Sequence, residues 1–212
     1  MESTPALLIF IACLLLGYLI GSLPFAVIVS RAFGLADPRG FGSGNPGATN
    51  VLRTGNKFAA LLTLLGDAAK GWVAMWLVAK VGAGDTAIAF TGLAAFLGHL
   101  FPIFLRFRGG KGVATAIGVL IGLDGMVALI AALTWAATAT IFRYSSLAAL
   151  AAACVAPGVA YALHGPDSLS LVIGIMCLLL IVRHRPNILR LFAGTENRIG
   201  ARPPPPPPSR EG

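Results

Sequence analysis

The chain has 212 residues, of which 57% are hydrophobic and 11% are charged, and its formal net charge is +8. A soluble domain of this size cannot bury so much apolar surface, so the composition excludes an ordinary soluble protein and favours a membrane protein. We expect one compact helical domain over residues 1–200 and a disordered, proline-rich tail over residues 201–212.

Long apolar runs follow one another along the chain. They cover residues 5–30, 58–80, 86–105, 112–142, 144–163 and 167–182. The first run has no basic residue ahead of it and no small-residue cleavage site after it, so we interpret it as a retained span. The fourth run exceeds the roughly 20 residues that one span needs. Within it, Gly122-Leu-Asp-Gly125 is typical of a turn, which predicts a short helix over 112–122 and a full one over 126–142.

The charged residues indicate how the spans are oriented. With seven spans, 14 of the 16 basic residues fall on one side, whereas six spans leave Arg143 and the basic C-terminal segment without a consistent side. The positive-inside rule therefore predicts an all-α, polytopic bundle with seven spans, an outside N-terminus and a cytoplasmic C-terminus. The short helix is about 17 Å long. We expect it to be a half-span whose N-terminus stays near the cytoplasmic surface. Topology explains the net charge, so no nucleic-acid partner is implied.

The first of three polar segments on the predicted cytoplasmic side runs from Gly42 to Arg53. It offers the hydroxyl of Ser43, the amides of Asn45 and Asn50, and the guanidinium of Arg53. These groups could bind a polar substrate, or the segment could be an ordinary turn rich in Gly, Asn and Pro.

The second segment follows His99, which ends a span, and contains Gly109, Gly110, Lys111 and Gly112. Glycines allow backbone N–H groups to turn inward, a helix N-terminus adds partial positive charge, and the lysine adds a full charge. This pattern predicts an anion site, and the alternative is a lysine that reaches out of the membrane at a span end. It is not a nucleotide P-loop, because the spacing of that motif is absent.

The third segment carries His184 and Asn187 and continues to Glu196, and it could also be a basic stop at the membrane exit. Within the second apolar run, Asp67 and Lys70 share a helix face at i, i+3. Because charges inside a membrane are costly, either a structural ion pair or a site-lining role would account for them.

These segments together resemble the bacterial membrane glycerol-3-phosphate acyltransferases of the PlsY type, from about residue 17 to residue 196. The matching motifs are Gly21-Ser22-Leu23-Pro24, Ser43-Gly-Asn-Pro-Gly-Ala-Thr-Asn50, Gly98-His-x-Phe-Pro-x-Phe104, Gly109-Gly-Lys-Gly-Val-Ala-Thr115 and His184-x-x-Asn187-x-x-Arg190. The resemblance implies a seven-span, multi-pass protein of the bacterial inner membrane whose active site faces the cytoplasm. It also implies an enzyme that moves a fatty acyl group from acyl phosphate to the sn-1 hydroxyl of glycerol-3-phosphate. The products would be lysophosphatidic acid and inorganic phosphate, in the first step of phospholipid synthesis.

The same resemblance suggests roles for the polar residues. Ser43 and Arg53 belong to the first functional motif, the glycines and Lys111 form a site for the phosphate of glycerol-3-phosphate, and Glu196 is structural. We therefore expect a catalytic set and a substrate-binding set. The catalytic set is Ser43, Arg53, His184 and Asn187, and the binding set is Asn45, Asn50, His99, Gly109, Gly110, Lys111 and Gly112.

Acyl phosphate is already activated, so the enzyme must align two anionic substrates, stabilise an oxyanion and remove one proton. We hypothesise that His184, held by Asn187, orients or deprotonates the attacking hydroxyl, with a substrate phosphate as the alternative proton acceptor. No clear base accompanies Ser43, so we expect direct transfer rather than an acyl-serine intermediate.

No cofactor is implied, and no metal either, because the acidic residues are scattered. The expected partners are glycerol-3-phosphate, acyl phosphate and membrane lipids. A transporter of organic phosphate or another anion is the competing function. Transporters, however, usually bind their substrate near the bilayer midplane, often between internal repeats.

Overall fold

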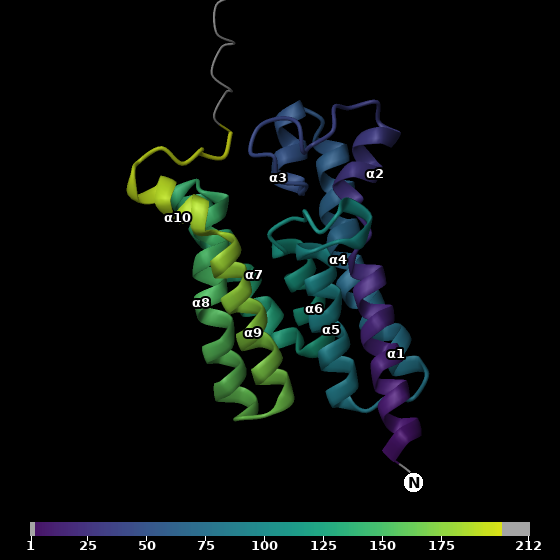
Figure 1. Cartoon of the computed structure of the whole chain (residues 1–212). Coiled ribbons are helices and arrows are strands. Elements are labelled where there is room, and N and C mark those ends of the chain that lie inside the picture. The colour runs from purple at the N-terminus through teal and green to yellow at the C-terminus, as the bar shows by residue number, and fades with distance from the viewer. Residues whose placement is uncertain (1–2, 201–212) are drawn as a thin grey trace, which may run out of the picture.

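The computed structural model describes residues 3–200, so the disorder expected for the tail at 201–212 concerns residues outside the described part. Within that part the secondary structure is helical throughout, which confirms the all-α prediction (Figure 1). The α-helices are α1 Ser3–Gly21, α2 Phe25–Ala32, α3 Ala48–Val51, α4 Lys57–Lys80, α5 Asp85–Leu100, α6 Val113–Leu123, α7 Gly125–Phe142, α8 Ser145–His164, α9 Ser168–Arg183 and α10 Arg185–Phe192. Two 3₁₀ turns, η1 Leu52–Thr54 and η2 Ile103–Leu105, lie in the connecting segments.

The helices form two groups that share one bundle. Helices α1, α4, α5 and α6 pack against one another, as do α7, α8 and α9, and contacts of α5 and α6 with α9, and of α6 with α7, join the groups. Helices α2, α3 and α10 lie at one end of the bundle, and the N-terminus lies at the other (Figure 1).

The lengths and surfaces of the helices are those of a membrane protein. Five segments are long and apolar enough to cross a membrane, and a sixth is added if α9 and α10, bent by 56°, count as one span. Large apolar side chains are exposed around the bundle, among them Leu8, Ile141 and Leu178, as expected when lipid is the solvent. The seven-span count and the orientation of the termini stay predictions.

The predicted turn inside the long fourth run is confirmed. Helix α6 ends at Leu123 and α7 begins at Gly125, with Asp124 between them. The Oδ1 atom of Asp124 accepts hydrogen bonds from the backbone N–H groups of Met126 and Val127, at 2.7 and 2.9 Å. Its Oδ2 atom lies 2.8 Å from Nε2 of His164, the last residue of α8. The α6–α7 turn therefore lies beside the α8–α9 turn.

This contact decides where the missing length of α6 falls. Helix α6 has 11 residues and its antiparallel neighbour α7 has 18. With one end anchored beside His164, α6 must begin roughly 10 Å short of the far end of α7, at 1.5 Å per residue. Figure 1 agrees, because α6 begins deeper in the bundle than α3 and α10. The N-terminus of this short helix is thus recessed, whereas we had expected it near the surface.

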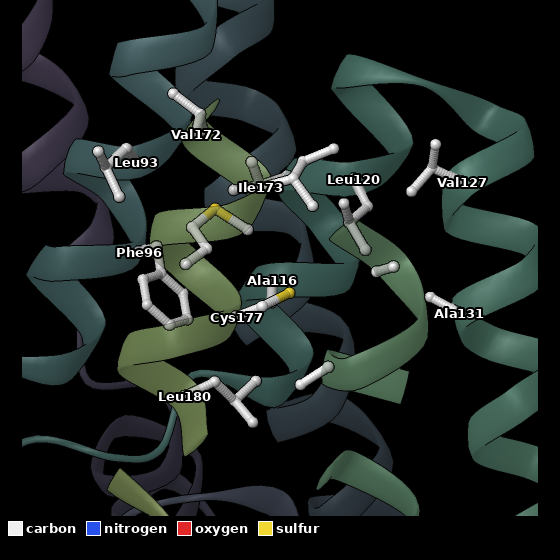
Figure 2. Packing of buried hydrophobic residues seen from close by; sticks show 14 of the residues in the cluster. Leu93, Phe96, Ala116, Leu120, Val127, Ala131, Val172, Ile173, Cys177 and Leu180 are labelled. Atoms are coloured by element: carbon white, nitrogen blue, oxygen red, sulfur yellow. The ribbon is translucent and has the colours of Figure 1, made fainter. Parts of the chain in front are cut away.

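One buried apolar cluster draws residues from six helices, α4 to α9. Phe96 from α5, Leu120 from α6, Val127 from α7 and Ile173 from α9 belong to one buried cluster (Figure 2). Close helix approaches support this packing. A Cβ on Gly118 would clash with the backbone of Ala68, so a side chain there would push α6 away from α4.

Candidate active site

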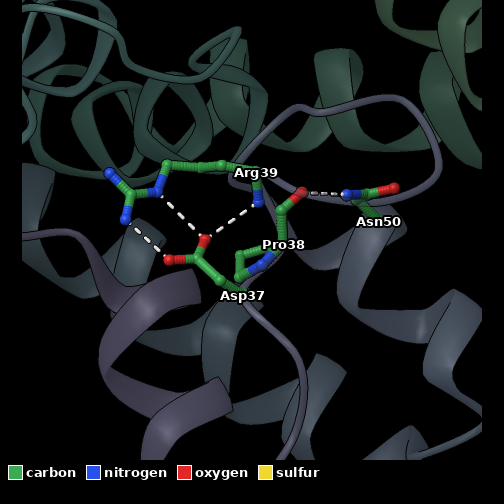
Figure 3. Close-up of polar contacts among 4 residues, drawn as sticks. All are labelled: Asp37, Pro38, Arg39 and Asn50. Carbon is green, nitrogen blue, oxygen red and sulfur yellow. Dashed lines mark hydrogen bonds and ion pairs between the residues drawn. The ribbon is translucent and has the colours of Figure 1, made fainter.

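The side chain of Asn50 folds the first polar segment onto itself. Its Nδ2 donates to the carbonyl of Pro38 at 2.6 Å (Figure 3) and to the carbonyl of Phe41 at 3.1 Å. Its Oδ1 accepts from the backbone N–H of Ser43 at 3.1 Å. Asn50 is buried, and these three bonds occupy its amide. It shapes the loop and leaves Ser43 exposed at the loop surface.

Arg53, in η1, lies against Gly42, the residue before Ser43. A Cβ on Gly42 would come within 2.9 Å of Nη1 of Arg53. The hydroxyl of Thr49 lies 3.5 Å from that of Ser145, the first residue of α8. This contact brings the first segment to the part of the bundle that holds the third.

The second segment is pressed onto the end of α5. Gly109 N–H donates to the carbonyl of Leu100 at 3.2 Å, and Gly110 N–H donates to the carbonyl of His99 at 3.1 Å. A Cβ on Gly109 would clash with the carbonyl oxygen of His99, and one on Gly110 would clash with its ring. These two glycines are therefore required by close packing, and their N–H groups do not point toward a ligand as we had expected.

The donors left for an anion lie one step further along the chain. Gly112 is the N-cap of α6, and the N–H groups of the first helical turn have no partner within their own helix. Lys111 precedes this turn and is half-buried. The recessed first turn of α6 and the Lys111 ammonium are thus the groups of this segment that can bind an anion.

Arg183 at the end of α9 connects the second and third segments. Its Nη2 donates to the carbonyls of Gly109 and Gly110, at 2.9 and 3.1 Å, and its Nε donates to Gly110 at 3.2 Å. The Gly-Gly turn is therefore clamped between α5 on one side and α9 on the other. From the sequence, we counted Arg183 only as one of several basic residues. Its position next to His184 could have indicated that it belongs to the site.

His184 follows Arg183 and is almost completely buried, with 2% of its surface exposed. Its Nδ1 lies 2.8 Å from the carbonyl of Leu180. Because a carbonyl can only accept, Nδ1 carries the proton and Nε2 keeps its lone pair. Burial lowers the pKa of His184 to about 4, although the bond to Leu180 opposes this shift. The imidazole is therefore neutral near pH 7.

The side chain of Asn187 does not hold His184, contrary to our hypothesis. Its Nδ2 donates to Oε1 of Glu196 at 2.6 Å. Glu196 also accepts from the hydroxyl of Ser146 at 2.7 Å and from Nε of Arg190 at 2.7 Å. Partial burial favours the neutral acid, but the three hydrogen bonds outweigh it and lower the pKa of Glu196. The ionised carboxylate ties α8, α10 and the segment after α10 together.

This arrangement leaves one polar atom of Asn187 available. Its Oδ1 is buried and has no hydrogen-bond partner among residues 3–200. Such an atom is costly to leave unpaired, so Asn187 has an acceptor available for a donor beyond the described residues.

The electrostatic surroundings of Lys111 show that all three segments meet. Burial lowers its pKa to about 8, the nearby Glu196 carboxylate opposes this shift, and Arg190, Arg53 and Arg183 add to it. Arg53 from the first segment and Arg183 and Arg190 from the third thus lie within interaction range of Lys111 in the second, as does the carboxylate of Glu196. Such a cluster attracts an anion.

Two pockets are lined by residues on either side of Lys111 in the sequence, one by Gly109 and Gly110 and the other by Val113. The first lies under the Gly-Gly turn, and its lining includes Ser22, Pro46, Lys70 and His99. The second is wholly apolar and lies between α6, α7, α8 and α9. It extends from Val113 and Leu180 to Leu120 and Ala156 two turns deeper.

Comparison with known proteins agrees with this arrangement. Residues 11–194 match the family described as "Glycerol-3-phosphate acyltransferase". The chain belongs to this family. A member from Dechloromonas aromatica is 57% identical over 189 residues, covering 89% of this chain and 96% of that protein. A member from Ralstonia nicotianae is 61% identical over 187 residues, covering 86% and 90%.

The solved structures of a family member have the same fold. The crystal structure of the integral membrane glycerol 3-phosphate acyltransferase PlsY in its glycerol 3-phosphate form superposes with a TM-score of 0.84. It is 38% identical, and the match covers 90% of this chain and 96% of that one. The lysophosphatidic acid form gives a TM-score of 0.83 at 36% identity. The resemblance inferred from the motifs is confirmed, and an anion transporter is not favoured.

The contact of Gly109 with α5 predicts a large effect of one methyl group. Gly109→Ala should push the loop off His99 and cost about 1–3 kcal/mol, which lowers Tm by roughly 2–4 °C per kcal/mol for a chain of this size. Gly84→Ala is the matched control, since Gly84 has an ordinary φ of −72° and open space around its Cβ position. Thermal unfolding in detergent measures both, and equal Tm values would contradict the packing role.

Proposed function

We propose that this protein transfers a fatty acyl group from acyl phosphate to the sn-1 hydroxyl of glycerol-3-phosphate, at a site facing the cytoplasm of a bacterial inner membrane. The observation that carries the proposal is the convergence of Lys111, Arg53, Arg183 and Arg190 around the recessed start of α6. Two phosphate-bearing substrates need such a concentration of positive charge. The PlsY forms named for glycerol 3-phosphate and lysophosphatidic acid support a substrate and a product of this kind.

We assign the phosphates of the two substrates to different cations, according to how deeply each cation lies in the bundle. Lys111 and the first turn of α6 are recessed, so we assign them the phosphate of glycerol-3-phosphate. Arg53 and Ser43 are exposed. In this proposal they contact the acyl phosphate and stabilise the charge that develops on its carbonyl oxygen. Asn45 and His99 stay within the proposed binding set, whereas Asn50 acts through the loop that it folds.

His184 is better suited to orientation than to proton removal. A base with a pKa of about 4 is weaker than a phosphate, whose second pKa is about 6. Nε2 of His184 and Oδ1 of Asn187 therefore serve as acceptors that orient the glycerol through its sn-2 hydroxyl, while the sn-1 hydroxyl donates its hydrogen to a phosphate oxygen. The sn-1 oxygen attacks the acyl carbon, its proton passes to a phosphate oxygen, and the bond from the acyl carbon to the leaving phosphate breaks.

The apolar pocket suits the acyl chain of the donor. Its lining includes Val113, two residues after Lys111, and Leu180, four residues before His184, and its walls are wholly apolar. A chain that enters there keeps its activated end at the cation cluster while its hydrocarbon part is shielded from water.

An acyl-transfer assay on purified protein in micelles tests the function. Palmitoyl phosphate and palmitoyl-CoA are supplied separately with glycerol-3-phosphate, and phosphate and lysophosphatidic acid are quantified. We expect turnover with palmitoyl phosphate alone. Turnover only with the CoA ester would contradict the donor assignment, and no turnover with either would favour an anion transporter.

Loss of the Lys111 charge should weaken binding of glycerol-3-phosphate. Lys111→Met removes a charge-assisted contact, which corresponds to roughly a 10- to 100-fold rise in KM for glycerol-3-phosphate. With a pKa of about 8, Lys111 loses its proton as pH rises through that value, so KM should also rise in the unmodified protein. Lys111→Arg keeps the charge and should remove this pH dependence. A parental KM in folded Lys111→Met would refute the assignment.

Filling the deep end of the apolar pocket should change the preferred chain length. Ala156→Phe places a ring opposite Leu120. We expect the kcat/KM ratio of palmitoyl to lauroyl phosphate to fall about tenfold or more, because several buried CH₂ groups lose their site. Cys154→Phe adds the same ring on the exposed side of α8 and is the control. If both variants showed the same ratio of kcat/KM for the two donors, the acyl chain would not lie in this pocket.

A further inference from the structure

Helix α4 carries an ion pair in the middle of an apolar span. Nζ of Lys70 lies 2.7 Å from Oδ1 of Asp67, and both side chains are almost completely buried. The cost of taking two charges out of water often exceeds their mutual attraction, so a buried pair is weak support for a purely stabilising role. The other contacts of the two residues indicate what the pair does.

Both residues reach other helices. Nζ of Lys70 also donates to the carbonyl of Leu23 at 2.9 Å, in the break between α1 and α2. Oδ1 of Asp67 also faces His99, whose Nδ1 lies 3.5 Å away at the end of α5. One carboxylate therefore joins α4 to α5 directly and to the α1–α2 break through Lys70.

His99 connects this cluster to the loop that leads into α6. Its carbonyl accepts the N–H of Gly110, and its ring occupies the space that a Cβ of Gly110 would need. On the other side, Arg183 donates to the carbonyls of Gly109 and Gly110. The position of the His99 ring thus sets how deeply the Gly-Gly turn lies in the bundle. It thereby also sets the position of Lys111.

We infer that Asp67 is a positioning residue for the phosphate site of glycerol-3-phosphate. It acts through His99 and the Gly-Gly turn on Lys111 and has no contact with substrate. An apolar side chain would fill the same space but could not fix the directions of an ammonium and an imidazole from two other segments. This inference rests on the proposed function, because it concerns the site that the proposal assigns to glycerol-3-phosphate.

The test must separate positioning from the instability of an unpaired buried charge. Asp67→Leu alone would leave Lys70 buried without its partner, so the main variant is the double substitution Asp67→Leu/Lys70→Met, which removes both charges. We expect Tm to stay near that of the parent while KM for glycerol-3-phosphate rises about tenfold, as for loss of one charge-assisted contact. KM for acyl phosphate should not change.

Two further variants sharpen the comparison. Asp67→Asn/Lys70→Met keeps an acceptor for His99 at the same place without leaving a charged Lys70 unpaired, and it should recover most of the loss in KM. Thr63→Ala removes a fully buried hydroxyl one turn earlier on α4, where it bonds only to the carbonyl of Ala59. This matched control should keep the parental KM.

A double-mutant cycle identifies the route of the effect. If Asp67 acts through Lys111, adding Lys111→Met to the double variant should raise KM by clearly less than the product of the two separate effects. If the effects of the double variant and of Lys111→Met on KM simply multiplied, the inference would be wrong. A parental KM for glycerol-3-phosphate in the double variant would also contradict it, as would equal rises of KM for both substrates. Failure of the proposed function gives a different result, since the parent would then show no turnover with acyl phosphate.

Discussion

Helix α6 is too short for the bundle that surrounds it, and the arrangement of the site depends on this mismatch. Asp124 anchors its C-terminal end beside His164, so the missing turns fall at the other end. The preceding loop must then descend between the helices to reach Val113. This descent brings Gly109 and Gly110 against α5, where only glycine fits, and the start of α6 lies below the level of α3 and α10 (Figure 1).

A recessed loop changes what its charges can do. Partial burial removes water from around Lys111, and in such surroundings charge–charge interactions are stronger than at an exposed surface. The arginines that approach it come from separate segments, each fixed by its own device: Arg53 by the loop that Asn50 folds, Arg183 by the Gly-Gly carbonyls and Arg190 by Glu196. The three arginines disfavour the charged form of Lys111, and a bound anion would offset this cost.

The cation cluster and the apolar pocket are neighbours because α6 and α9 contribute to both. The first residue of the pocket on α6 is Val113, two residues after Lys111, and Leu180 on α9 accepts the hydrogen bond of His184. A substrate with a phosphate at one end and a hydrocarbon chain at the other matches this change from polar to apolar surface along two helices. The proposed acyl donor and the proposed product both have that form.

The sequence by itself determined the features that depend on near neighbours in the chain. Apolar runs defined the helices, Gly122-Leu-Asp-Gly125 marked the α6–α7 turn, the i, i+3 spacing predicted the Asp67–Lys70 pair, and the motifs identified the family. Only the tertiary structure decided which distant groups meet. The packing of Gly109 and Gly110 on His99, their clamp by Arg183, the bond from Asn187 to Glu196 and the depth of α6 are contacts between separate segments. Neither periodicity nor local spacing specifies such contacts, because they depend on how far each helix extends through the bundle.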